Sequence, residues 1–142
     1  MAGKIATITL FLAAIVFLGA GFVGANADDG STSPSPLEPK DQAGNTLSSV
    51  SSGQLVILST DVANNNPEPT KFTAIIEVRD AKGVTLFLGW LSGTLNPDGH
   101  TGVGLSWAPK EAGTYQLRTF TISGFQDLEI LSPVVTNKLD VS

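Results

Sequence analysis

The sequence predicts an all-β fold, a sandwich of about seven short strands between Gln54 and Ser142. Three observations favour this fold. Short apolar runs recur with turn residues between them about every 8–12 positions, several runs alternate strictly between apolar and polar residues, and no run has the 3.6-residue period of a helix. Two sheets packed face to face would bury one row of side chains from each strand.

The first two expected strands flank an asparagine- and proline-rich turn. Leu55–Val62 is dense in β-branched and aliphatic residues. The run from Asn64 to Pro69 ends this strand, because asparagine tolerates turn geometry and proline is excluded from central strands. The next strand, Phe72–Arg79, alternates cleanly, with one face formed by Phe72, Ala74, Ile76 and Val78.

A hairpin is expected next, with Asp80–Gly83 as its turn, because Gly83 readily adopts the positive φ that closes such a turn. The returning strand, Val84–Leu91, has Val84, Leu86, Leu88 and Trp90 on one face. We expect this face to point into the core, with Trp90 among its largest side chains.

The remaining elements follow a second tight turn, Asn96–Gly99, whose proline and glycine favour a reversal. This turn joins a short strand at Thr94-Leu95 to a strand whose Trp107 is the other large core residue expected. The last strands are expected at His100–Trp107, Thr114–Ile122, Leu128–Leu131 and Val134–Val141.

One short motif carries a resemblance to a known fold family. Glu111–Tyr115 reads EAGTY and resembles the corner that precedes a late strand in immunoglobulin-like and fibronectin-like domains. The resemblance implies that the Tyr115 hydroxyl hydrogen-bonds to loop backbone and fixes the crossover between sheets. With the runs TDVANN, VRD and LSWAP, residues 53–142 resemble the Ig-like, adhesion-related modules of secreted archaeal and bacterial surface proteins. Such modules act as spacers, adhesins and accessory domains, so the resemblance implies a fold more than a function.

The N-terminus predicts export. Ile5–Val23 is uncharged and follows a single basic residue, Lys4, so residues 1–27 are either a signal peptide or a membrane anchor helix. Ala25 and Ala27 form a small-x-small pattern that a signal peptidase accepts, whereas the 19-residue length of the run also suits a membrane span. In both cases the chain from Asp28 onward is expected outside the cytoplasm.

Residues 28–53 are expected to form a flexible linker. Serine, proline, glycine and acidic residues dominate this stretch, and its larger apolar residues are Leu37, Leu47 and Val50. We expect too little apolar burial to offset the entropy of ordering the segment.

Charge and composition narrow the partners. Lys4 is the one basic residue of the leader, so residues after Ala27 hold 13 acidic residues against seven of the eight basic ones, a formal charge near −6. This sign disfavours nucleic acid as a partner. The chain has no cysteine, which excludes a disulfide framework, a thiolate nucleophile and a lipidated cysteine.

No motif predicts catalysis, a cofactor or a metal. His100 is the one histidine and follows a turn, which favours solvent exposure over a role as base or ligand. The acidic residues are spread one or two per loop, so a calcium site would depend on loops that happen to meet. We therefore expect a protein that is not an enzyme.

An apolar patch on one sheet is the candidate functional surface. If Tyr115 and Leu117 point inward, strand alternation points Phe120 and Ile122 outward. The patch predicted from neighbouring strands consists of Ile75, Phe87, Leu91, Phe120, Ile122 and Phe125. The alternative is a β-bulge near Arg118-Thr119 that returns Phe120 and Ile122 to the core.

The function expected from these features is that of an exported cell-envelope module that works by contact with another surface protein or a second copy. One alternative is a subunit of a filament or membrane complex, in which residues 28–53 add a strand to a neighbour's sheet. Another is a ligand- or polysaccharide-binding accessory domain. Its aromatic candidates, Trp90, Trp107 and Tyr115, are better explained as core residues.

Overall fold

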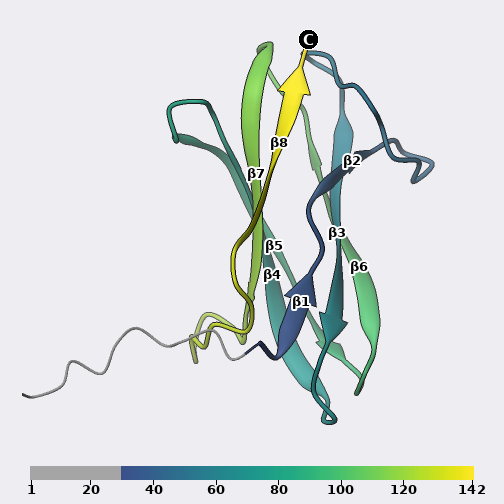
Figure 1. The fold of residues 1–142 in the computed structure, drawn as a ribbon, viewed down its shortest axis with the longest axis vertical. Coiled ribbons are helices and arrows are strands. Elements are labelled where there is room, and N and C mark those ends of the chain that lie inside the picture. Colours follow the sequence, from purple (N-terminus) through teal and green to yellow (C-terminus); the bar gives the residue numbers. More distant parts are fainter. Residues whose placement is uncertain (1–29) are drawn as a thin grey trace, which may run out of the picture.

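The computed structural model describes residues 30–142, and in them eight strands form two antiparallel sheets that face each other (Figure 1). The strands are β1 (Thr32–Pro34), β2 (Glu38–Lys40), β3 (Val56–Asn64), β4 (Thr70–Arg79), β5 (Thr85–Leu95), β6 (His100–Trp107), β7 (Gly113–Ile122) and β8 (Val135–Val141). The predicted all-β sandwich is confirmed for this part of the chain.

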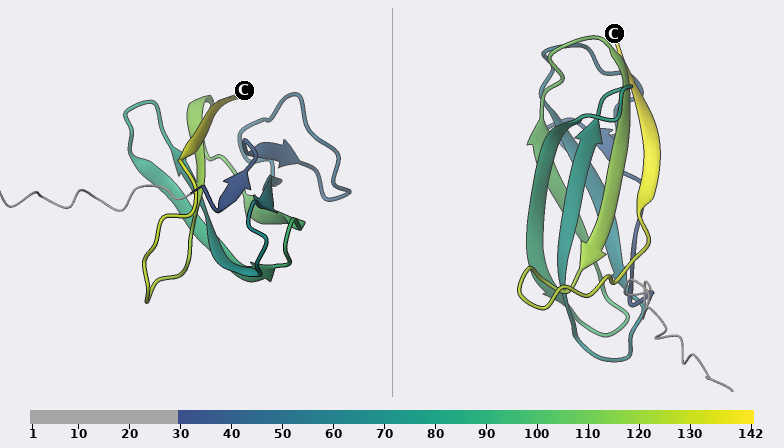
Figure 2. Two further views of the ribbon diagram at one scale, coloured as in Figure 1. Left: turned by 60° about the horizontal axis from the view of Figure 1, so that its bottom comes forward. Right: turned by 90° about the vertical axis from the view of Figure 1, so that its left-hand side faces the viewer.

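The two sheets differ in how they are completed. In the first, β3 pairs with β6 along one side, while β1 and β2 follow each other along its other side. The second has the order β5-β4-β7-β8, so β5 and β8 are its edges (Figure 2, right). The core between the sheets contains the predicted row of β4, and Trp107 is buried there.

The prediction of a flexible linker is wrong for residues 30–53, which are part of the sandwich. Pro34 pairs with Val62 and Pro39 with Leu58, so two short strands cover the edge of β3. Leu37 and Val50 are almost fully buried in the core. The composition predicted a linker because it does not show that β3 has an edge to which the segment can pair, where a few apolar residues are enough to anchor it. Proline is tolerated at such an edge because its missing N–H is not needed there.

The orientation expected for β5 is also wrong. Trp90 pairs with Ile75 and Leu88 with Glu77, on the face that points away from the core, and Trp90 is 53% exposed. Gly89 pairs instead with the core residue Ile76, and a Cβ built on Gly89 would lie 2.5 Å from Cδ1 of Leu105. The inner face of β5 is therefore filled partly by side chains of the opposite sheet, which leaves its larger side chains outside.

Several boundaries also differ from expectation. Thr94-Leu95 belongs to β5 and is no separate strand, so β5 is 11 residues long. Leu128–Leu131 forms no strand and makes one isolated bridge, between Ile130 and Ile122. Residues 54–142 therefore hold six strands where about seven were predicted, and residues 30–53 hold two more.

The N-terminal predictions fall outside the described residues. These are the signal peptide or anchor helix at residues 1–27 and the cleavage pattern at Ala25 and Ala27. Between residues 30 and 142 there is no helix of the length and hydrophobicity that a membrane span requires.

Candidate interaction surface

The outer face of the second sheet has an apolar row across three strands. Ile75 of β4 pairs with Trp90 of β5 on one side and with Phe120 of β7 on the other. Residues directly opposite each other in antiparallel strands share a face, so these three side chains form one row. Ile75 at the centre is buried although it lies outside the core between the sheets, because its neighbours cover it.

Two further side chains extend this row. Leu88 is two residues from Trp90 on the same face and is 54% exposed. Phe125, from the loop after β7, is 57% exposed and meets the Trp90 ring edge to face, with ring centroids 5.3 Å apart. We call the surface formed by Ile75, Leu88, Trp90, Phe120 and Phe125 the Trp90 patch.

The loop after β7 holds Phe125 against Trp90. Its two ends are joined because the Ser123 amide donates to the Glu129 carbonyl and the Glu129 amide donates to the Ser123 hydroxyl, both at 3.0 Å. The Ser123 hydroxyl in turn donates to the Asp127 carbonyl. Hydrogen bonds among Ser123, Asp127 and Glu129 therefore hold the loop in the conformation that places Phe125 on the sheet face.

Polar groups border the patch at both ends. On one side Glu77, opposite Leu88, accepts hydrogen bonds from Arg79 and, at 2.9 Å, from Arg118. On the other side the hydroxyls of Thr73 and Ser92 are 2.7 Å apart, at the start of a hollow of about 600 Å³. That hollow is lined by Lys71, Phe72, Thr73, Ser92, Gly93, Thr94, Ser123, Gly124, Phe125, Gln126 and Asp127.

The predicted patch residues fall into three groups. Ile75, Phe120 and Phe125 lie on the outer face as expected, and β7 pairs with β4 without the bulge that was the alternative. Ile122 shares this face, opposite Thr73, but it is buried and bridges to Ile130 of the loop.

Phe87 and Leu91 are on the other face, because they pair with the core residues Val78 and Ala74. Leu88 and Trp90 take their places on the outer face and were missed. One signal for this was present in the sequence, since Gly89 and Gly93 share a face with Phe87 and Leu91. Glycine in a strand often marks close approach of another group.

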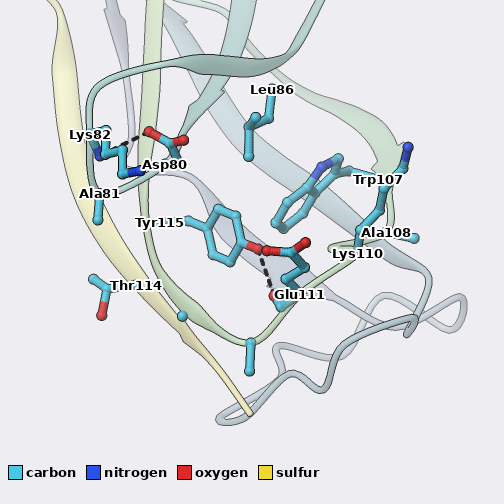
Figure 3. A pocket seen from close by; sticks show the side chains of 12 residues that line it. Asp80, Ala81, Lys82, Leu86, Trp107, Ala108, Lys110, Glu111, Thr114 and Tyr115 are labelled. Atoms are coloured by element: carbon cyan, nitrogen blue, oxygen red, sulfur yellow. Dashed lines mark hydrogen bonds between the residues drawn. The ribbon is translucent and has the colours of Figure 1, made fainter.

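Tyr115 forms the corner that the resemblance implied. Its hydroxyl donates to the Glu111 carbonyl at 2.6 Å, and its ring packs edge to face on Trp107, with centroids 5.3 Å apart (Figure 3). Both rings border a hollow of about 550 Å³ at this end of the sandwich, together with Leu86, Lys110 and the turn at Asp80–Lys82 (Figure 3). The polar atom of Tyr115 is already satisfied by its own loop, which indicates a structural role.

Within residues 30–142 no three histidine or acidic side chains gather in a way that would hold a metal ion. His100 is exposed at the start of β6. Of the nine large apolar side chains that are exposed in this part of the chain, three belong to the Trp90 patch: Leu88, Trp90 and Phe125.

The fold is similar to that of several solved proteins. The CARDB domain of a Pyrococcus furiosus protein, crystallised with di-metal ions, has a TM-score of 0.54 at 15% identity, covering 83% of this chain and 95% of that one. The C-terminal domain of wzt has a TM-score of 0.63 at 10% identity, covering 83% and 77%. A Paenibacillus cycloisomaltooligosaccharide glucanotransferase has a TM-score of 0.55 at 15% identity, but the match covers 13% of that enzyme.

Identities this low show a shared fold alone. The Ig-like sandwich expected from the EAGTY corner is thus confirmed as a fold. No protein-family model and no curated protein sequence matches the chain.

Proposed function

We propose that this protein is a non-enzymatic, exported module of the cell envelope that binds another envelope protein through the Trp90 patch. The observation that carries the proposal is the exposure of Trp90, Leu88 and Phe125 on one sheet face. Exposure of such side chains to water is unfavourable, and a contiguous apolar area of this kind is typical of a contact site. Export is inferred from the apolar run Ile5–Val23.

The border of the patch suits a protein partner. Aromatic residues at the centre, with Glu77, Arg79 and Arg118 at the margin, match the apolar core and polar rim of protein interfaces. Trp90 is the expected anchor, because tryptophan is enriched among the residues that contribute most to binding.

Co-sedimentation with envelope fragments from the cells that make the protein tests this proposal. We expect the double variant Trp90→Ser/Phe125→Ser to bind at least about tenfold more weakly, because each aromatic contributes more than about 1 kcal/mol when buried. Its melting temperature should stay near that of the wild type, since both side chains are already half in water.

The matched control is Leu55→Ser/Val134→Ser, which removes two exposed apolar residues that belong to no part of the patch. This control should bind like the wild type. Equal binding by both double variants, or equal loss in both, would contradict the proposal.

The alternative in which residues 28–53 add a strand to a neighbour loses support, because β1 and β2 occupy the edge of the chain's own β3. The polysaccharide-binding alternative gains one observation. Trp90 is outside the core, beside a hollow with the hydroxyls of Thr73 and Ser92 and the carboxylate of Asp127. Exposed aromatic rings beside hydroxyl and carboxylate groups are what a sugar ring requires.

Affinity electrophoresis in gels that contain envelope polysaccharide tests this second candidate. Both Trp90→Ser and Asp127→Asn should reduce retardation if the hollow binds a glycan. A wild type whose migration the polysaccharide does not retard would contradict this candidate and favour the protein contact.

A further inference from the structure

The edges of the two sheets are protected to very different degrees. The free side of β3 is covered by a segment with Pro34, Pro36 and Pro39, and β8 has Lys138 and Asp140 near its end. Prolines and charges are the usual means by which proteins prevent edge strands from pairing with other molecules. β6 exposes no large apolar side chain.

β5 has none of these protections. It is the longest strand of the described residues, with 11 residues, and Val84–Leu95 contains neither a proline nor a charged residue. It pairs with β4 alone, and Figure 2 (right) shows it along the open side of the sheet. Within residues 30–142 the backbone of residues 86–94 makes no hydrogen bond besides those with β4, whereas the Leu95 carbonyl accepts one from the Asn64 side chain at 3.5 Å. Its outward N–H and C=O groups are therefore a template for another strand.

The side chains of β5 are complementary to those of a second β5. A two-fold axis through Trp90, the midpoint of Thr85–Leu95, places Phe87 opposite Gly93 of the second copy and Gly89 opposite Leu91. Each large side chain on the inner face then faces a glycine. An axis one residue later, at Leu91, would place Leu91 against its own copy and glycine against glycine, which loses this match.

Charge also permits self-pairing. The chain has a formal net charge of −5, so copies repel each other over most of their surface. Along β5 no charged residue meets its own copy. On the outer face the axis brings two Trp90 side chains opposite each other, at a Cβ separation of about 4.5–5.5 Å.

We propose that β5 of one molecule pairs antiparallel with β5 of a second copy about a two-fold axis at Trp90. The β5-β4-β7-β8 sheets of the two molecules then form one continuous sheet, and the two Trp90 patches form one surface that crosses the axis. This inference deepens the proposed function and rests on it for the use of the joined surface, but the pairing itself is measured separately.

Disulfide trapping tests the pairing and its register, and the absence of native cysteine makes it clean. Leu88 and Ser92 are opposite each other across the proposed axis. We therefore expect a mixture of Leu88→Cys and Ser92→Cys proteins to form a crosslinked heterodimer under mild oxidation. Each variant alone should not crosslink, because its own two copies are about 13 Å apart at about 3.3 Å per residue. The protein is purified in the form to which cells process it.

The matched control is the pair Thr136→Cys and Lys138→Cys on β8, the other edge of the same sheet. This mixture should not crosslink. Failure of the Leu88→Cys/Ser92→Cys mixture to crosslink, or equal crosslinking of the β8 pair, would overturn the inference.

Sedimentation equilibrium gives an independent measurement. The wild type should dimerise with rising concentration, and Leu88→Lys should remain monomeric, because it places two lysines beside the axis. The melting temperature of Leu88→Lys should stay near that of the wild type, since Leu88 is 54% exposed. Thr136→Lys should dimerise like the wild type. A monomeric wild type over the same concentrations would also overturn the inference.

The two proposals fail separately. If Leu88→Cys and Ser92→Cys crosslink but Trp90→Ser/Phe125→Ser binds envelope fragments like the wild type, the pairing stands and the proposed function is wrong. If no pairing occurs but that double variant loses binding, the proposed function stands and the pairing is wrong.

Discussion

Two segments of this chain have positions opposite to those that their hydropathy suggests. Residues 30–53 are polar and rich in proline, yet they cover the edge of β3 and contribute Leu37 and Val50 to the core. β5 is among the most apolar strands, yet Leu88 and Trp90 face solvent. Burial therefore depends on the sheet edge or face that a segment occupies more than on its hydropathy. Two apolar residues bury residues 30–53 because they reach the core, whereas β5 has a neighbouring strand on one side alone and keeps part of its apolar surface in solvent.

The largest expected effect comes from truncating the buried leucine of residues 30–53. Leu37→Ala should lower the free energy of unfolding by about 2–5 kcal/mol, the usual cost of a cavity in a packed core. Leu88→Ala on β5 should change it by about 0.5 kcal/mol, as for a surface residue. Urea denaturation measures both. Similar values for the two would show that residues 30–53 are the loose linker expected from composition.

An intermediate effect is expected from the polar contact between the same segment and β7. The Thr32 and Thr121 hydroxyls are 2.5 Å apart and both residues are buried. Thr32→Val keeps the shape but leaves the Thr121 hydroxyl without this partner, which should cost about 1–3 kcal/mol. Thr94→Val, on β5, is the matched control and should be nearly neutral. Equal effects would mean that the contact contributes nothing.

Fluorescence distinguishes the two tryptophans directly. In Trp107→Phe the remaining Trp90 should emit at long wavelength and be readily quenched by iodide, because it is half exposed. In Trp90→Phe the remaining Trp107 should emit at shorter wavelength and be several-fold less accessible to iodide, because it is buried against Tyr115. Self-pairing through β5 would protect Trp90 at high concentration, so quenching is compared in dilute protein. The reverse order would show that β5 is oriented as hydropathy alone suggests.

The smallest expected effect concerns the exposed turn after β2. The side-chain amide of Asn45 and, with a smaller effect, its backbone N–H donate hydrogen bonds to the Asp41 carboxylate. They lower the pKa of that carboxyl below its ordinary value of 3.8. A lowered pKa in the folded state means that the contribution to stability is complete above pH 3.8 and is lost as the pH falls through the lower, folded-state pKa. Amide exchange at Ala43 and Asn45 should therefore accelerate below that pH, and Asp41→Ala should show the faster exchange already at neutral pH. Identical exchange in both proteins would contradict this.

Local sequence patterns predicted the strands with two distinct faces. Phe72–Arg79 alternates between one fully apolar face and a mixed one, so its core row was predicted correctly. In Val84–Leu91 both faces carry large apolar side chains, so the alternation of the strand does not indicate which face points into the core. Pairing with β4, and the approach of Leu105 to Gly89, settle the choice. Of the residues predicted for the patch, Ile75, Phe120, Ile122 and Phe125 are on the outer side of the sheet, whereas Phe87 and Leu91 are on the inner face.

By itself the sequence determined the class of fold, the tight turns at Asp80–Gly83 and Asn96–Gly99, and the Tyr115 corner, because each depends on residues close together in the chain. Tertiary structure alone decided that residues 30–53 complete the first sheet and that Trp90 faces outward. Both outcomes depend on partners far along the chain: the vacant edge of β3 and the side chains that fill the space beneath β5. A local pattern holds no information about such partners, since edge and face become distinct only when the two sheets have met.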